Sequence, residues 1–179
     1  MNLPSLWRGL RPRVPANQQF CSPLPAPARI ALLEAGFQPG PNMCEGTVEG
    51  LASLRFWAPE VLVLPLDLAL ALADRKLRGL FDLPSLDTAI VVLTSVDDSL
   101  LADHHRDLLW QAFGLPVFEQ LRASDGAVIA SECEVHDGLH IIESRPDLKG
   151  EVVTDHCACG AETPRLRSLS PVLTRSAAG

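Results

Sequence analysis

The sequence predicts an α/β fold in which a parallel sheet of the βαβαβ type carries a small antiparallel annex. Two continuous apolar segments, residues 60–64 and 88–94, have the length and composition of strands that are buried on both faces. The segment between them predicts a helix over residues 65–78 that Gly79 ends. After residue 119 the sequence changes to short strand-like pieces separated by turn residues, which is typical of antiparallel pairing.

The part of the chain that precedes this sheet has its own local signals. Residues 1–27 are rich in proline, which interrupts helices and lacks the N–H that a strand ladder needs, so we expect an extended or flexible leader. Residues 28–36 predict a short amphipathic helix that ends at Gly36. In residues 47–57 apolar side chains recur at intervals of three, which predicts a helix that ends before Pro59.

The middle of the chain completes the parallel unit. We expect Asp97 or Asp98 to cap the next helix, which extends to about Phe113. Gly114 ends that helix, and residues 116–119 form a third short strand. The order strand, helix, strand, helix, strand at this spacing indicates a right-handed βαβαβ unit.

Three short pieces form the expected annex, namely residues 127–134, 139–143 and 151–154. Asp/Gly and Pro/Asp/Lys/Gly turns separate them, which favours antiparallel strands. Residues 28–167 are therefore expected to form a single domain. Residues 168–179 have little pattern and predict a loose tail.

Composition and charge exclude several classes of partner. The chain has 179 residues and a formal net charge of −7, so it lacks the basic surface that nucleic acid or an anionic membrane requires. It has neither an apolar run long enough to span a bilayer nor a secretory signal, so we expect a cytoplasmic protein. The five cysteines are an odd number and a poor disulfide framework, which in a reducing compartment favours metal binding or chemistry.

Four pieces of the sequence resemble one enzyme family, in the same order along the chain. They are APEVLVLPLDLALALADRKLRGLFDLPSLDTAIVVLTS, DDSLLADHHRDLLWQAFGLPVFEQ, ASECEVHDGLHI and CACGAETPRL. The family is the AMP-dependent, adenylate-forming ligases, in the phenylacetate–CoA ligase branch, and a weaker match extends the resemblance over about residues 28–167. The resemblance implies part of the N-terminal domain of that fold.

The chain departs from this family at the nucleotide site. It has no Ser/Thr/Gly-rich, lysine-containing loop of the kind that wraps a triphosphate. Where the family has a Tyr-Gly-x-Thr/Ser-Glu loop, this chain has residues 121–125, in which Ser124 and Asp125 are the remnants of the nucleotide site. The family's ribose-binding aspartate and its C-terminal domain with the catalytic lysine have no counterpart in this sequence. We therefore expect no adenylation by this chain alone, and ATP, AMP and CoA are doubtful ligands.

Cysteine and histidine gather on two segments of the annex. Zinc prefers four tetrahedral thiolate and imidazole ligands, and structural sites usually assemble from two sequence-local pairs. The sequence predicts a structural Cys₃His zinc site here, as the resemblance also implies. The predicted ligands are Cys133, His136, Cys157 and Cys159, with His140 and His156 as alternates for the histidine.

The sequence also allows interpretations of these cysteines and histidines that involve no structural zinc. The thiols could belong to a buried strand and to a solvent-facing turn without any metal. A catalytic zinc is not favoured, because it would need an open ligand position and a nearby base. Strand alternation turns Glu132 and Glu134 away from Cys133. Arg165 is expected to anchor a carboxylate near the zinc-binding turn.

The leading hypothesis for function is a non-catalytic, shortened relative of the phenylacetate–CoA ligase adenylation domain. It would act as a binding or accessory protein, with zinc as a structural staple of the annex. One alternative is a subunit of a split acyl-adenylate or acyl-CoA ligase, completed by a separate protein partner. Another is a decayed fragment without a function of its own. The sequence leaves the oligomeric state open.

Overall fold

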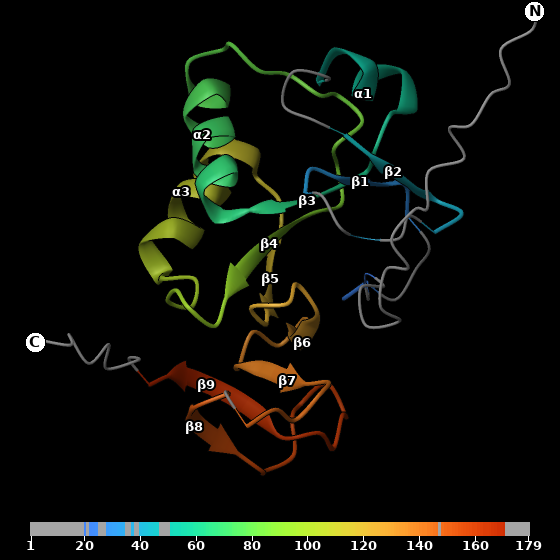
Figure 1. Cartoon of the computed structure of the whole chain (residues 1–179). Coiled ribbons are helices and arrows are strands. Elements are labelled where there is room, and N and C mark those ends of the chain that lie inside the picture. The colour runs from blue at the N-terminus through green and yellow to red at the C-terminus, as the bar shows by residue number, and fades with distance from the viewer. Residues whose placement is uncertain are drawn as a thin grey trace, which may run out of the picture.

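The computed structural model of the chain describes residues 20, 22–24, 28–34, 37, 40–46, 51–146 and 148–170. Within these residues nine strands form one mixed sheet, in the order β2-β1-β3-β4-β5-β6-β7-β9-β8 (Figure 1). The α/β class predicted from the sequence is confirmed. The helices and strands are α1 (Leu51–Trp57), α2 (Leu66–Leu77), α3 (Asp103–Phe113), β1 (Ile30–Leu32), β2 (Met43–Glu45), β3 (Val61–Pro65), β4 (Ala89–Ser95), β5 (Val117–Arg122), β6 (Val128–Glu132), β7 (Leu139–Ile141), β8 (Gly150–Val153) and β9 (Arg165–Leu169).

Strands β1 to β5 form the parallel half of the sheet. β1 pairs in parallel with both β2 and β3, and β4 pairs in parallel with β3 and β5. The chain passes through α2 between β3 and β4, and through α3 between β4 and β5, as parallel strands require a crossover. The strand order reverses at β1, because β2 and β3 lie on its two sides. Ligands of open α/β sheets bind at the carboxyl ends of the strands beside such a reversal.

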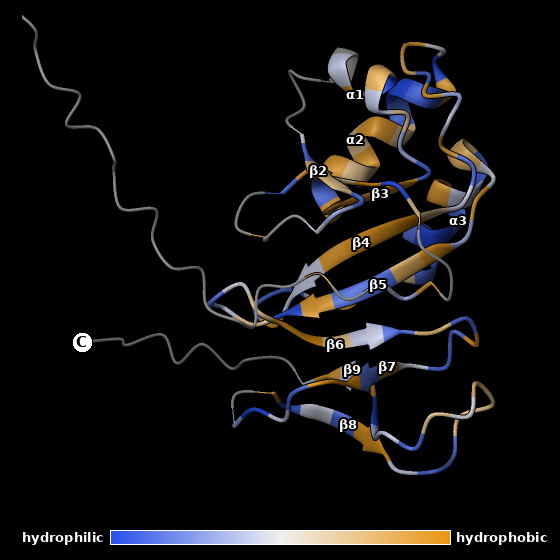
Figure 2. Ribbon diagram, turned by 90° about the vertical axis from the view of Figure 1, so that its right-hand side faces the viewer, coloured by the Kyte–Doolittle hydropathy of each residue, from blue (hydrophilic) through white to orange (hydrophobic). Residues whose placement is uncertain are grey.

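Alternate residues of the parallel strands enter two apolar cores, one on each face of the sheet. On one face Leu62 and Ile90 pack with Leu54 of α1, Leu72 of α2 and Leu109 of α3. The other core joins the intervening strand residues to apolar side chains from the N-terminal part of the chain. Figure 2 shows β3 and β4 coloured as hydrophobic along most of their length, as strands covered on both faces should be.

Strands β6 to β9 form the antiparallel annex. β6 pairs antiparallel with β5, so the annex continues the same backbone ladder as the parallel half. In the next pairs His140 of β7 lies opposite Ser131 of β6 and Arg165 of β9. β8 is the edge strand of the annex, and none of its residues is buried. The annex therefore joins the parallel half through β6, and β8 joins the sheet through β9.

The helix predicted over residues 28–36 is wrong, because Ile30–Leu32 forms strand β1. All three of its residues are buried, and each pairs with partners in both β2 and β3. A short apolar run that is covered on both faces has no polar side, and its periodicity does not separate strand from helix. The sequence pattern also predicts neither β2 nor β9.

The capping role predicted for Asp97 or Asp98 is also wrong. α3 begins later, at its N-cap residue Ala102, and no side chain makes a capping hydrogen bond there. The loop before α3 is instead fixed to β5, because the Leu101 N–H donates to Oε1 of the buried Glu119 at 2.9 Å. A contact from β5 therefore fixes the loop that leads into α3, and the helix itself has no side-chain cap.

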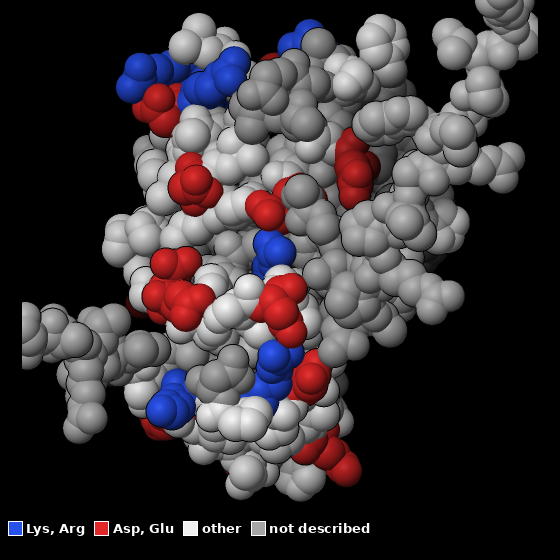
Figure 3. Space-filling view, in the orientation of Figure 1, with Lys and Arg blue, Asp and Glu red and all other residues white. Residues whose placement is uncertain are grey.

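Most of the predicted leader and tail lies outside the described residues. Phe20 is described, and its ring meets that of Phe37 edge to face with 6.3 Å between centroids. At the other end β9 continues to Leu169. No helix in the described ranges combines the length and apolar character needed to cross a membrane. Acidic and basic side chains are interspersed on the face that Figure 3 shows.

The burial of β1 gives a direct test of this fold. Leu32 is 0% exposed, so Leu32→Ala should lower the free energy of unfolding by about 2–5 kcal/mol, measured by urea denaturation. Leu80→Ala is the matched control, because Leu80 is 65% exposed and its truncation should change that free energy by about 0.5 kcal/mol or less. Equal effects of the two substitutions would contradict the placement of β1 within the sheet.

Candidate metal centre and neighbouring cavity

Three thiols and one imidazole converge where the annex loops meet. Cys133 follows β6, His140 belongs to β7, and Cys157 and Cys159 lie in the loop between β8 and β9. Their Sγ atoms and one imidazole nitrogen all lie within 4.8 Å of one another. Three separate segments of the chain therefore bring three sulfur atoms and one imidazole nitrogen together in one cluster.

Two distances within this cluster are close to those of a tetrahedral zinc site. With Zn–S bonds of about 2.3 Å and Zn–N bonds of about 2.0–2.1 Å, two sulfurs should lie about 3.8 Å apart and a sulfur and a nitrogen about 3.6 Å apart. The Sγ atoms of Cys133 and Cys157 are 3.8 Å apart, and Sγ of Cys159 is 3.4 Å from Nε2 of His140. The cluster could hold a zinc-sized cation with little movement of the side chains.

Contacts around the cluster orient its donor atoms. Nδ1 of His140 lies 2.8 Å from Oγ1 of Thr163, which leaves Nε2 directed at the thiols. The Ala161 N–H donates to Sγ of Cys159 at 3.5 Å. Metal-binding histidines usually have such a hydrogen bond on the second ring nitrogen, because it fixes the ring. These contacts point the lone pairs of the two side chains toward a shared centre.

The thiols of the cluster do not ionise equally without a cation. Burial raises the pKa of Cys133 to about 12, although the backbone N–H of Val135 lowers it. The backbone N–H of Cys159 lowers the pKa of Cys157, and the charge of Arg165 adds to this effect. Cys133 therefore keeps its proton at neutral pH unless a metal displaces it, so that metal binding would release a proton.

The histidine of this cluster is His140, the predicted alternate, and not His136. His136 has a positive φ of 56° and stacks on Phe118, with 5.2 Å between ring centroids. Its Nδ1 lies 3.1 Å from Oε1 of Glu132, so its ring is already paired outside the cluster. His156, the other alternate, is exposed and does not belong to the cluster.

The predicted anchoring role of Arg165 is confirmed. Its guanidinium forms ion pairs with the carboxylates of Asp137 and Asp155, which lie in the two loops that carry the thiols. Arg167, two residues further along β9, also pairs with Asp137 at 3.1 Å. The ion pairs lower the pKa of Asp137, with Arg165 as the largest cause.

Ser124 and Asp125, the predicted nucleotide-site remnants, lie in the exposed turn between β5 and β6. Oγ of Ser124 donates to Oδ2 of Asp97 at 2.9 Å. Asp125 accepts the Ala127 N–H at 3.1 Å and pairs with Arg145 at 3.0 Å. Both side chains therefore have protein partners that hold the turn.

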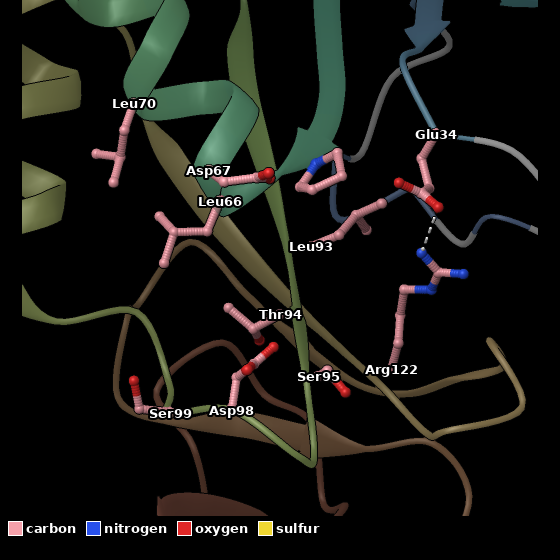
Figure 4. A pocket seen from close by; sticks show the side chains of 11 residues that line it. Glu34, Leu66, Asp67, Leu70, Leu93, Thr94, Ser95, Asp98, Ser99 and Arg122 are labelled. Carbon is pink, nitrogen blue, oxygen red and sulfur yellow. Dashed lines mark ion pairs between the residues drawn. The ribbon is translucent and has the colours of Figure 1, made fainter.

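A cavity of about 500 Å³ lies at the carboxyl ends of β3 and β4 (Figure 4). Leu66 and Leu70 of α2 and Leu93 of β4 supply apolar lining. Thr94 and Asp98 add a hydroxyl and a carboxylate from the end of β4 and the loop that follows it. An apolar wall with a few polar groups is the usual character of a small-molecule site.

One ion pair borders this cavity on the side of β1. Glu34 follows β1, and Arg122 ends β5, with 3.3 Å between a carboxylate oxygen and a guanidinium nitrogen (Figure 4). Arg122 also lies over the ring of Phe37, 5.2 Å from its centroid, and donates to the carbonyl of Gly126 at 3.1 Å. Arg122 is thus a well-held cation at the cavity wall.

A buried carboxylate network lies between the cavity and the cluster. Oε1 of Glu119 accepts the hydroxyl of Thr94 at 2.7 Å. Arg106 of α3 pairs with Glu119 at 3.4 Å and with Glu132 at 3.0 Å. Burial raises the pKa of Glu119, although the Thr94 hydroxyl, the Leu101 N–H and the charge of Arg106 lower it.

Sequence reasoning missed the network and the cavity, because residues distant in the sequence form both. The charged Glu119 directly after the apolar residues Val117 and Phe118 was the available signal, since a buried charge requires a partner. Strand alternation could also have favoured His140, which lies within β7, over His136, which lies in the preceding loop. No local pattern indicates Thr163 as the partner of the imidazole.

Comparison with known proteins finds similarity to solved structures. No protein-family model and no curated protein matches the chain. Among solved structures it is similar to a 2-hydroxyisobutyryl-CoA ligase crystallised in an open conformation with 2-HIB-AMP and CoA, with a TM-score of 0.55 and 12% sequence identity. The match covers 79% of this chain and 47% of that chain, so the chain spans about half the length of the ligase. At this identity the similarity shows the fold alone, which is that of part of an acyl-CoA ligase.

The raised pKa of Glu119 predicts a pH dependence of stability. The protonated form is favoured in the folded protein, so the stability contribution of this group is complete below its ordinary pKa of 4.5 and is lost as pH rises through the folded value. Glu119→Gln removes this titration, and the wild-type minus variant difference in the free energy of unfolding should therefore fall as pH rises from 4.5. Urea denaturation across pH 4 to 8 measures it, with the exposed Glu151→Gln as the control for loss of one carboxylate. A difference that rises with pH would contradict the assignment.

Proposed function

We propose that this chain is a binding or accessory relative of the adenylate-forming ligases, in the phenylacetate–CoA ligase branch, and that it does not catalyse adenylation alone. A structural zinc bound by Cys133, His140, Cys157 and Cys159 holds its annex together. The convergence of these four donor atoms from three separate segments is the observation that carries the proposal. The ligase-like fold and the ordered sequence pieces support the relationship.

The donor set fits zinc better than other common cations. Thiolates and imidazole are soft or borderline ligands and suit zinc, whereas magnesium and calcium prefer oxygen donors. Four protein ligands complete a tetrahedral shell, which is typical of structural sites rather than catalytic ones. The zinc would join the end of β6 and β7 to the loop between β8 and β9, where β8 has little apolar burial.

The cavity supports a binding role. It lies where open α/β sheets bind their ligands, and its volume of about 500 Å³ is in the range of small-molecule sites. Ser124 and Asp125 do not line it, and both hold the exposed turn described above. The loop that in the ligase family faces adenine is thus used here for structure, which favours binding without adenylation.

A second candidate function is a subunit of a split acyl-CoA ligase. The observation that favours it is the extent of the structural match, since the chain covers only 47% of the ligase chain. A separate protein would then supply the remaining parts, and activity would appear only on mixing the two. A decayed fragment is the remaining alternative, and failure of the isolated chain to unfold cooperatively with zinc present would favour it.

The zinc proposal predicts the metal content of the purified protein. Elemental analysis should find about one zinc per chain, and Cys159→Ser or His140→Asn should reduce it strongly, because either removes one of four ligands. At free zinc 100 times above its dissociation constant, the stability gain should be about 2.7 kcal/mol.

His136→Asn is the matched control for the metal measurement, because it removes a histidine close in sequence that lies outside the cluster. This variant should keep its zinc. Loss of zinc from His136→Asn with retention by His140→Asn would contradict the assigned ligand set. A wild-type protein free of metal, and of unchanged stability on adding zinc, would refute the site.

The proposed lack of adenylation is tested by exchange of pyrophosphate into ATP. The purified, zinc-loaded chain should show no exchange above background with phenylacetate or other carboxylic acids, because its sequence contains no phosphate loop. A complete acyl-CoA ligase under the same conditions is the positive control. Exchange with any acid by the chain alone would overturn the non-catalytic assignment.

A further inference from the structure

The guanidinium of Arg165 is buried at the base of the Cys/His cluster. The side chain is 1% exposed, so its charge has lost nearly all of its hydration. A buried charge costs several kcal/mol unless ion pairs and hydrogen bonds compensate it. A long cationic residue at such a position therefore needs a structural reason, and the reason lies in the two segments that it contacts.

The two arms of this guanidinium reach different loops. Nη1 donates to the carbonyl oxygen of Asp137 at 2.8 Å and also pairs with the carboxylate of that residue. Nη2 donates to Oδ1 of Asp155 at 2.6 Å. Nε has no hydrogen-bond partner among the described residues, so all the polar contacts of the guanidinium go to these two loops.

Each of these loops carries thiols of the cluster. Asp137 follows Cys133 in the β6–β7 loop, and Asp155 precedes Cys157 in the loop between β8 and β9. The planar fork of arginine fixes the relative position of two carboxylates, which the single ammonium of lysine cannot do. One side chain thus sets the separation between the two thiol-bearing segments.

The turn beside Asp137 is also pressed against β9. Gly138 has a φ of +87°, and a Cβ there would lie 2.8 Å from the carbonyl oxygen of Leu166. His140 pairs directly opposite Arg165 across the β7–β9 ladder. The imidazole and the guanidinium are therefore positioned by the same strand pair, and a shift of β9 would move both.

We propose that Arg165 is the positioning residue of the metal centre, holding the two thiol-bearing loops at metal-binding distance before the cation arrives. This inference rests on the proposed zinc site. The proposed contribution of Arg165 is the spacing of the two loops, and the charges of Arg165 and Arg167 are paired with those of Asp137 and Asp155. Contacts outside the ligand shell of this kind typically change metal affinity 10–100-fold.

The test compares Arg165→Met with wild type, using zinc and cobalt(II) alone as probes. Zinc affinity is measured by competition with a chromophoric chelator, and cobalt(II) absorption reports the ligand geometry. Arg165→Met should still bind one metal per chain, with an affinity about 10–100-fold lower and a changed cobalt spectrum at saturation. The changed spectrum separates misplaced ligands from a general loss of stability.

Arg167→Met is the matched control, because Arg167 lies on the same strand and pairs with Asp137 but, among the described residues, not with Asp155. It should change the affinity less than about threefold and leave the cobalt spectrum unchanged. Where Arg165→Met does not fold, Asp155→Asn replaces it, since the Asp155 side chain is 64% exposed and its loss breaks one arm of the fork. That variant should also bind metal more weakly and alter the spectrum.

The outcomes separate this inference from the zinc proposal beneath it. Wild-type affinity and an unaltered cobalt spectrum in Arg165→Met, or in Asp155→Asn where that variant replaces it, would overturn the positioning role and leave the metal centre intact. A wild-type protein that binds neither zinc nor cobalt would overturn the metal centre and the positioning role together. Equal effects of Arg165→Met and Arg167→Met would also contradict the bridging of two loops.

Discussion

The outer strands of the annex contain too little apolar surface to be held in place by burial alone. The charged side chains and the Cys/His cluster of the annex follow from that constraint. Its core is a small cluster around Leu121, Ile129, Leu139 and Leu166, and β8 beyond it is mostly exposed. Small structural units with such limited cores usually depend on disulfides or metals. Here a buried arginine and a set of soft donor atoms lie where the apolar core ends.

Two charged clusters among the described residues stabilise different parts of the fold. The buried Glu119 and Glu132 of β5 and β6 pair with the half-buried Arg106 of α3, and Glu119 also holds the loop before α3. Arg165 with its two aspartates lies at the other side of the annex and joins loops rather than strands. Both use the guanidinium fork, which can satisfy two carboxylates at once.

The sequence predicts the α/β class and the central elements well, because long apolar runs and glycine or proline boundaries are local signals. It fails at β1, where a three-residue strand buried on both faces has the same composition as a short helix. In the Cys/His cluster the structure brings together the three thiols that the sequence names and His140, which the sequence offers as an alternate to His136. The choice between His136 and His140 depends on a turn with positive φ and on the β7–β9 register, which sequence spacing does not contain.

The antiparallel pairing of β5 with β6 has a mechanical consequence. The annex is not attached through a linker, since its first strand shares backbone hydrogen bonds with the last strand of the parallel half. A hinge between the two parts would have to break this ladder, whereas a change in the twist of the sheet would not. Arg122 at the end of β5 lies both in this ladder and at the cavity wall. Any displacement of the annex would therefore deform the continuous sheet and with it the cavity wall. It would not rotate the annex as a separate body.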